Sequence, residues 1–357
     1  MITINNNMYV LDTDNTSYAF AVLGSGQLEH LYYGRKLHAN EAVMTEKHTF
    51  IPGNTNVYNK DYSSYSLEDV CLEMSSLGKG DIREPFIEVT YPNGSSTTDM
   101  VFDRAEIIQG KEEYDTLPGS YDDNGEVEQL VIYLKDRNYN LTLELHYYVY
   151  EKCDIITRSA KLVNSGNESV RLERLMSMQL DLNESDYELS FFNGAWAREM
   201  NRSRIPIRAG KYVNESVTGT SSNRANPFFM IGRSSTTEDY GECYGFNLIY
   251  SGNHYEAAQV NSYGKLRLVS GINPATFSYI IEAGKCFEAP EAVLTYSYKG
   301  YNRMSHNMHE FVRKHIVRGS WRDKERPVLI NSWEAAYFNI CLLYTSPSPT
   351  RPRLISY

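Results

Sequence analysis

From the start of the chain to about residue 290, apolar and polar residues alternate in short runs separated by turn sequences, and this pattern constrains the fold most. In one run the apolar positions are Leu141, Leu143, Leu145, Tyr147 and Val149, and the residues between them are Thr142, Glu144, His146 and Tyr148. In a second run Leu172, Met176, Met178, Leu180 and Leu182 stand against Glu173, Ser177, Gln179 and Asp181. A period of two residues is typical of a β-strand that buries one face. We therefore expect strands here rather than helices.

The turn sequences between the predicted strands contain the residues that commonly reverse a chain. They are Tyr91–Ser95, Asp122–Gly125, Asn164–Asn167 and Tyr250–Asn253. Gly, Asn and Pro favour such turns because they accept the backbone angles that a reversal requires. Closely spaced turns between alternating strands predict a large antiparallel β-sandwich, with two extended sheets packed face to face.

The periodicity changes near residue 300, where the sequence predicts an amphipathic helix from Tyr301 to Val317. One face of this helix would carry Met304, Met308, Phe311, Val312 and His315. The polar segment Arg318–Pro327 follows and contains Gly and Pro, so we expect a linker there.

Val328–Ile330 is a short continuous apolar run, which is typical of a strand buried on both faces. The residues after Ile340 are rich in Pro, Ser and Arg, so we expect a disordered tail that is not native sequence. The expected organisation has four parts: a β-sandwich domain over residues 1–295, a linker helix and connector over 296–325, a strand over 326–339, and the tail over 340–357.

The charge of the chain limits its partners. The 357 residues have a net charge of −10 and no basic stretch, so we expect neither nucleic acid nor a membrane as a partner. The sequence contains 29 Tyr against 13 Phe, and the amphipathic Tyr ring suits both half-buried strand faces and surfaces that contact sugars. A basic segment followed by an apolar run is absent from the first residues, so we expect a cytoplasmic protein.

The cysteines and histidines give no metal-binding pattern. Cysteine occurs five times, as Cys71, Cys153, Cys243, Cys286 and Cys341, without a Cys-x-x-Cys pair. We expect reduced and mostly buried thiols. His306 and His309 share a face of the predicted helix. No third ligand accompanies them, so solvated surface histidines are favoured over a metal site.

Two loops could contribute to a binding site. Gly78–Pro85 contains Asp81 and Arg83, which we interpret as a surface turn with a weak ion pair, while a pre-arranged functional loop is the alternative. Phe191–Glu199 places Trp196 beside flexible backbone and a charged pair. These residue types suit a sugar, but a core Trp next to a surface ion pair explains them equally well.

A third candidate, Asn331–Ala335, follows the predicted strand at Val328–Ile330. Barrel enzymes place their ligands at the carboxyl ends of such strands, which favours a binding role for Trp333. A structural Trp that plugs the barrel is the alternative.

Eight segments, in their order along the chain, carry a resemblance to a known family. They are His30–Gly34, Gly80–Pro85, Tyr150–Ser159, Gly194–Glu199, Asn226–Phe228, Tyr244–Gly252, Gly271–Pro274 and Arg326–Ala335. Over residues 1 to about 339 the chain resembles the N-terminal part of a bacterial-type α-galactosidase of glycoside hydrolase family 36. The resemblance implies a mainly β chain: a large antiparallel β-supersandwich, then a linker helix and the first strand of a truncated (β/α)8 barrel. The family pattern ends at about Ile340.

The resemblance also implies an activity in carbohydrate metabolism, namely retaining hydrolysis of terminal α-galactosyl residues of melibiose, raffinose and related oligosaccharides. It implies no metal or organic cofactor, and a homo-oligomer, which is a tetramer in related full-length enzymes. The family's nucleophile is an Asp in a Lys-x-Asp-x-Asn motif, and its acid/base is an Asp after a Cys-x-x-Gly-Gly-type loop. Neither motif occurs here. We therefore assign no catalytic residue, expect both aspartates beyond the end of the chain, and expect the chain alone to be inactive.

Two substrate-binding residues follow from the resemblance. Trp333 matches the Trp that ends the first barrel strand and lines the galactose pocket, and Trp196 matches an N-terminal-domain Trp close to the substrate. An N-terminal-domain loop reaches a neighbouring active site in tetrameric members, but the segment from Glu46 to Lys60 departs from that pattern and no residue is assigned there. The alternative function is a non-catalytic β-sandwich that binds carbohydrate or mediates oligomerisation.

Overall fold

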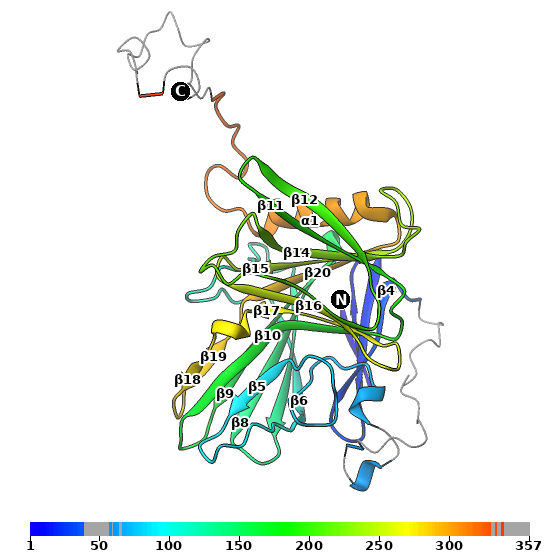
Figure 1. Cartoon of the computed structure of the whole chain (residues 1–357), viewed down its shortest axis with the longest axis vertical. Helices are drawn as coiled ribbons and strands as arrows, with labels where there is room; N and C mark the ends of the chain where they lie inside the picture. Colours follow the sequence, from blue (N-terminus) through cyan, green and yellow to red (C-terminus); the bar gives the residue numbers. More distant parts are fainter. Residues whose placement is uncertain (39–56, 59, 64–65, 330–332, 334–336, 339–357) are drawn as a thin grey trace, which may run out of the picture. The chain divides into compact units, whose positions relative to one another are not determined.

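The computed structural model describes residues 1–38, 57–58, 60–63, 66–329, 333 and 337–338 (Figure 1). The chain divides into two compact units, residues 1–316 and residues 317–357. The first unit contains β-strands β1 to β20 and the helix α1, and every strand pairing within its three sheets is antiparallel. The prediction of a mainly β, antiparallel chain followed by a helix is confirmed.

A four-stranded sheet starts the chain and is drawn in blue in Figure 1. Its order is β1-β2-β3-β4, so each strand pairs with the next along the sequence. The strands are β1 (Ile2–Asn5), β2 (Met8–Asp12), β3 (Thr16–Val22) and β4 (Leu28–Arg35). Two short 3-10 helices, η1 (Lys60–Tyr62) and η2 (Leu67–Asp69), precede the next strand.

A six-stranded sheet has the order β13-β16-β17-β10-β18, and β5 pairs with β10 outside this path. Its strands are β5 (Ile87–Thr90), β10 (Val170–Leu182), β13 (Gly210–Glu215), β16 (His254–Val260), β17 (Leu266–Ile272) and β18 (Tyr279–Ile281). The 3-10 helix η4 (Pro274–Thr276) joins β17 to β18.

A ten-stranded sheet has the order β12-β11-β14-β15-β20-β9-β8-β7-β6, and β19 pairs with β9. Its strands are β6 (Met100–Gln109), β7 (Glu128–Asp136), β8 (Leu141–Tyr150), β9 (Ile155–Asn164), β11 (Glu188–Ala195), β12 (Arg198–Pro206), β14 (Ala225–Gly232), β15 (Cys243–Ile249), β19 (Cys286–Glu288) and β20 (Glu291–Ser297). The 3-10 helix η3 (Glu151–Cys153) joins β8 to β9.

One large hydrophobic core receives side chains from all three sheets. Phe20 of the first sheet, Leu180 of the second and Leu143 of the third belong to it, and each is fully buried. Burial of a large apolar side chain contributes about 1.5–3 kcal/mol relative to exposure. The core therefore joins the sheets into one unit and fixes the loops that leave them.

The predicted alternation holds for one strand and fails for another. In β8, Leu141, Leu143 and Leu145 are buried, and the residues between them are half-buried. In β10, Gln179 and Asp181 on the polar face are also fully buried, so the prediction of a single buried face is wrong for this strand. The segment before β5 covers that face through its hydrogen bonds to β10, which include Leu72 N to Asp181 Oδ2 at 2.9 Å and Ser75 Oγ to Gln179 Oε1 at 2.8 Å.

The predicted turns and helix lie where the sequence placed them. All four turn sequences join consecutive strands, and Gly94 and Gly125 in two of them have φ of 81° and 67°. The helix α1 spans Gly300–His315 and packs against β20, β15 and β9. Phe311 is buried as expected, whereas Val312 is 43% exposed and lies off the buried face.

The described part of the second unit is small. Val328 and Leu329 belong to no strand and are exposed, and Ile330 lies outside the described residues. A barrel strand over residues 326–339 therefore stays a prediction, and the expected tail over 340–357 also lies outside the described residues. Within the described ranges, no helix is both long and apolar enough to cross a membrane.

The cysteine prediction is confirmed for the positions that can be assessed. The free thiols of Cys71, Cys153 and Cys243 are buried, and that of Cys286 is exposed. Cys341 lies outside the described residues.

Candidate functional site

Trp196 stands at the tip of the β11–β12 hairpin and is 90% exposed. The interpretation of this residue as a core Trp is therefore wrong. Two neighbours in the hairpin, Ala197 and Met200, have left-handed backbone angles, with φ of 58° and 57°. Non-glycine residues hold this conformation only where the surrounding structure fixes it. The tip is thus a defined structure that presents an indole to solvent.

Three local contacts fix this tip. A side-chain oxygen of Glu199 accepts a hydrogen bond from the backbone N–H of Ala197 at 3.0 Å. The amide of Asn201 donates to the carbonyl of Arg198 at 2.6 Å. At Gly194 a Cβ atom would lie 2.4 Å from that same carbonyl oxygen, so only Gly allows the two strands to approach this closely. A bare, fixed indole can stack on the apolar face of a sugar ring.

Trp333 lies in the second unit and is 44% exposed. Its ring packs against those of Tyr337 and Phe338, at centroid distances of 5.5 and 4.9 Å. The structure does not bring Trp333 and Trp196 together, because the two belong to different units.

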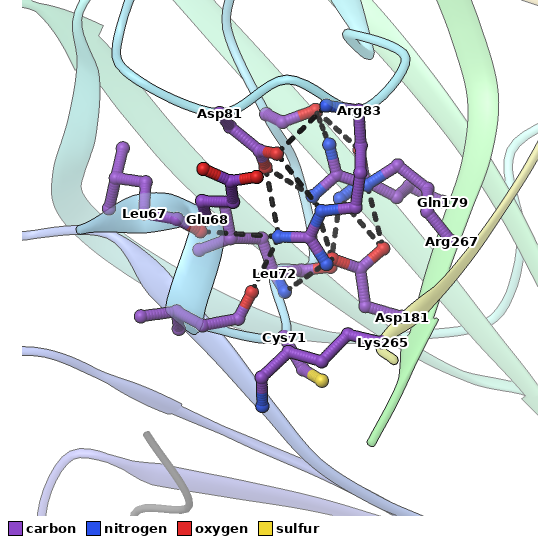
Figure 2. Close-up of polar contacts among 12 residues, drawn as sticks. Leu67, Glu68, Cys71, Leu72, Asp81, Arg83, Gln179, Asp181, Lys265 and Arg267 are labelled. Atoms are coloured by element: carbon purple, nitrogen blue, oxygen red, sulfur yellow. Dashed lines mark hydrogen bonds and ion pairs between the residues drawn. The ribbon is translucent and has the colours of Figure 1, made fainter. Parts of the chain in front are cut away.

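The Gly78–Pro85 loop differs from the expected surface turn. Arg83 and Asp81 have side chains that are 0% and 2% exposed, and the Arg83 Nε atom lies 2.9 Å from Asp81 Oδ1. The interpretation as a weak, exposed ion pair is therefore wrong. Two further charged residues complete a buried tetrad, Asp181 of β10 and Arg267 of β17 (Figure 2).

Within this tetrad each cation contacts both anions. Arg83 Nη1 lies 3.1 Å from Asp181 Oδ2, and Arg267 Nη2 lies 2.7 Å from a carboxylate oxygen of each aspartate. Burial raises the pKa of Asp81, but the guanidinium groups of Arg267 and Arg83 outweigh this effect and hold that pKa below its ordinary value. The four charges cancel.

The backbone of the covering segment completes the tetrad. Arg83 donates to the carbonyls of Leu67 and Val70, and Arg267 donates to that of Glu84, at 2.8 to 3.2 Å (Figure 2). Buried charges that are paired and hydrogen-bonded in this way fix one arrangement of the chain. The tetrad therefore ties the loop before β5 to β10 and β17, and we assign it a structural role.

A second buried network centres on Glu73. Its carboxylate accepts hydrogen bonds from the hydroxyls of Tyr18 and Tyr147, each at 2.7 Å, and lies 2.6 Å from Nδ1 of His30. Arg158 supplies the opposite charge, with Nη1 at 3.1 Å. This network joins the four-stranded sheet to β8 and β9.

The remaining candidates do not form a metal site. His306 and His309 lie on α1 with ring centroids 6.5 Å apart. Among the residues that the structure describes, no group of three or more His, Cys, Asp or Glu side chains could hold a metal ion.

The architecture and the exposed Trp hairpin together define a large β-sandwich domain of glycoside hydrolase type. The chain belongs to glycosyl hydrolase family 36: the model of that family's N-terminal domain matches residues 26–282, and the Melibiase model matches residues 286–342. The resemblance found in the sequence is thereby confirmed.

The chain is similar to α-galactosidases of known sequence and structure. It is 37% identical over 335 residues to α-galactosidase AgaA of Geobacillus stearothermophilus, covering 92% of this chain and 45% of the relative. It is 35% identical over 336 residues to the bifunctional α-galactosidase/sucrose kinase AgaSK of Mediterraneibacter gnavus, covering 94% and 36%. The crystal structure of the Lactobacillus brevis α-galactosidase superposes with a TM-score of 0.90 at 36% identity, covering 96% of this chain and 47% of that one. The chain thus spans about half the length of these relatives or less.

Proposed function

We propose that this chain is the substrate-flanking β-sandwich part of an α-galactosidase that removes terminal α-galactosyl residues from oligosaccharides of the raffinose and melibiose type. The observation that carries the proposal is the similarity to α-galactosidases along nearly the whole chain, at 37% identity over 92% of it for AgaA. Crystal structures of AgaA variants with stachyose and with raffinose support this class of substrate. The cytoplasmic location expected from the sequence stays a prediction.

Trp196 and Trp333 are the residues that we propose to contact the sugar. The fixed hairpin and the 90% exposure of Trp196 support a stacking role, since an exposed indole at a rigid tip loses little conformational entropy on binding. Trp333 supports the proposal through its position after the predicted barrel strand. Both would bind and orient the sugar rather than take part in bond cleavage.

The proposed mechanism is retaining hydrolysis without a cofactor. It requires two carboxyl groups about 5–5.5 Å apart, one acting as nucleophile and one as acid/base. Two of the buried carboxylates, Glu73 and Asp181, are already occupied by arginine and by other hydrogen-bond donors. We therefore propose that the catalytic aspartates belong to the barrel and that this chain alone is inactive, while the intact enzyme is a homo-oligomer.

An assay of the purified 357-residue chain on p-nitrophenyl α-galactoside tests this assignment. We expect no release of p-nitrophenol above that of a mock preparation from cells without the chain. Turnover that co-purifies with the chain and is absent from the mock preparation would show that it contains a complete catalytic site.

The exposure of Trp196 also favours a second candidate function, that of a non-catalytic carbohydrate-binding domain. Calorimetric titration with galactose, melibiose and raffinose separates the two. A sugar-binding domain would saturate at modest concentrations of melibiose or raffinose, and replacing Trp196 by Ala would abolish that binding. Half of an enzyme pocket would bind them only weakly.

A further inference from the structure

We propose that this chain binds a neutral monosaccharide in a cavity between β4, the end of β10 and β15, away from Trp196. The cavity has a volume of about 180 Å³, and the lining residues used below are His30, Tyr33, Asp181, Tyr187, Arg233 and Tyr244. We call it the β4–β10 cavity. The proposal goes beyond the assignment as part of an α-galactosidase and does not depend on it.

Two buried polar atoms of the lining residues lack a protein partner. Nε2 of His30 and the hydroxyl of Tyr33 accept and donate no hydrogen bond, although the two residues are only 3% and 4% exposed. A buried polar group without a partner costs about 1–3 kcal/mol. Two such atoms at one cavity indicate that a ligand with hydroxyl groups completes them.

Glu73 fixes what the His30 ring can do. Its carboxylate lies 2.6 Å from His30 Nδ1 and next to Arg158. Burial raises the pKa of Glu73, but Arg158 and the hydrogen bond from His30 outweigh this effect and keep the group ionised. An ionised carboxylate accepts from Nδ1–H, so Nε2 of the neutral ring carries a lone pair. The ligand atom at this position must therefore donate a hydrogen bond, as a sugar hydroxyl does.

The charged side chains of the lining are already paired. Arg233 contacts Glu184 at 2.5 Å and Glu242 at 2.7 Å, and its guanidinium lies over the ring of Tyr187. Asp181 belongs to the buried tetrad with Arg83 and Arg267. The lining thus offers a phosphate or a cation no unpaired charge, and a neutral ligand fits best.

Aromatic walls and size narrow the ligand further. The ring of Tyr244 lies 5.6 Å from that of Tyr33 and 6.1 Å from that of Tyr187. Tyrosine rings suit the C–H face of a sugar and hydrogen-bond at their rim. Pockets for drug-sized ligands are roughly 300–1,000 Å³, so this smaller cavity fits one sugar ring rather than an oligosaccharide.

Tyr33→Phe in the purified chain is the sharpest test, because it removes only the unpartnered hydroxyl. Its matched control is Tyr301→Phe, since the Tyr301 hydroxyl on α1 is also buried without a partner but lies outside the cavity lining. The probes are D-galactose and D-glucose, with inorganic phosphate as the charged comparison. Binding is followed by calorimetry and by the 15N signal of the His30 Nε2 atom, assigned from its absence in His30→Gln.

We expect saturable binding of at least one hexose, a change in the His30 signal on binding, and no effect of phosphate. Tyr33→Phe should weaken binding at least about tenfold, whereas Tyr301→Phe should leave it unchanged. Trp196→Ala should also leave the His30 response unchanged, which separates this cavity from the proposed substrate contact. Absence of hexose binding, or binding that Tyr33→Phe does not weaken, would overturn the proposal and leave water as the occupant. Neither outcome bears on the α-galactosidase assignment.

Discussion

Asp181 lies between two buried guanidinium groups, and its charge is the one that Arg83 and Arg267 share with Asp81. Asp181→Asn removes that charge and leaves two buried cations facing one carboxylate. Breaking a buried ion pair in this way costs about 3–5 kcal/mol. We expect a loss of that size in the free energy of unfolding, measured by urea denaturation.

The control is an exposed ion pair on the ten-stranded sheet. Asp103 and Lys135 form a contact of 3.0 Å with side chains that are 31% and 58% exposed. Asp103→Asn should cost less than about 1 kcal/mol, because solvent screens such pairs. Equal losses in the two variants would contradict the structural role of the tetrad.

Glu256 on β16 gives a pH dependence of the opposite origin. Its residue is 2% exposed, Asn214 donates to Oε2 at 2.6 Å, and Oε1 has no hydrogen-bond partner. Burial raises the pKa of Glu256 well above its ordinary value, so the folded chain keeps this group protonated at neutral pH. The unfolded chain ionises it near pH 4.3, at about the ordinary value for Glu.

The stability contributed by Glu256 is therefore complete below about pH 4.3 and is lost as the pH rises towards the folded pKa, at up to about 1.4 kcal/mol per pH unit. Glu256→Gln abolishes this titration. Relative to the unsubstituted chain, we expect the variant to become more stable as the pH is raised from 5 to 8, measured by urea denaturation at each pH. The exposed Glu106 offers the control, and an equal trend in Glu106→Gln would contradict this origin.

The β11–β12 hairpin is the element that holds Trp196, and Gly194 is its closest point. Gly194→Ala would place a Cβ atom 2.4 Å from the carbonyl oxygen of Arg198, so the strands must separate. Overpacking of this kind costs about 1–3 kcal/mol. We expect that loss in thermal unfolding, together with a changed fluorescence of Trp196 that Trp196→Phe identifies. At Gly24 the atom nearest to an added Cβ would be 3.7 Å away, so Gly24→Ala should leave both properties nearly unchanged.

Elements with one covered face were predictable, and elements covered on both faces were not. The alternation in β8 matches its burial because solvent is accessible on one side of the strand. The same alternation in β10 failed at Gln179 and Asp181, since the segment before β5 covers the polar face. Local periodicity contains no information about a distant segment of the chain that covers a strand.

At the scale of the whole molecule, the division into two units predicts where the chain can be shortened. All three sheets and α1 belong to residues 1–316. A chain that ends at residue 320 should therefore melt within about 2 °C of the full chain, which corresponds to less than about 1 kcal/mol. Calorimetry measures this midpoint.

A chain that ends at residue 298 is the control for this shortening. It lacks α1 and so loses Tyr301, Met304 and Phe311, which are buried against the strands. We expect it to melt at a much lower temperature. Equal destabilisation by both truncations would contradict the division.

The candidate site was predictable only in part. The resemblance identified Trp196 by its matching segment, but the sequence left a core Trp and an exposed Trp equally open. The structure decided for exposure, because positive φ angles and the contact at Gly194 turn the hairpin tip outwards. Trp333 belongs to another unit, so its distance from Trp196 stays a prediction.

The sequence by itself determined the strands, the turns, the position of α1 and the family. Each of these depends on residues close in the chain or on ordered segments, and a period of two or 3.6 residues reflects local backbone geometry. Only the tertiary structure decided that Asp81 and Arg83 are buried with Asp181 and Arg267, and that His30 and Tyr33 line one cavity. The physical reason is that burial, pKa and pairing depend on which distant segment covers a side chain, and the alternation of residues along a strand is the same whether or not that cover is present.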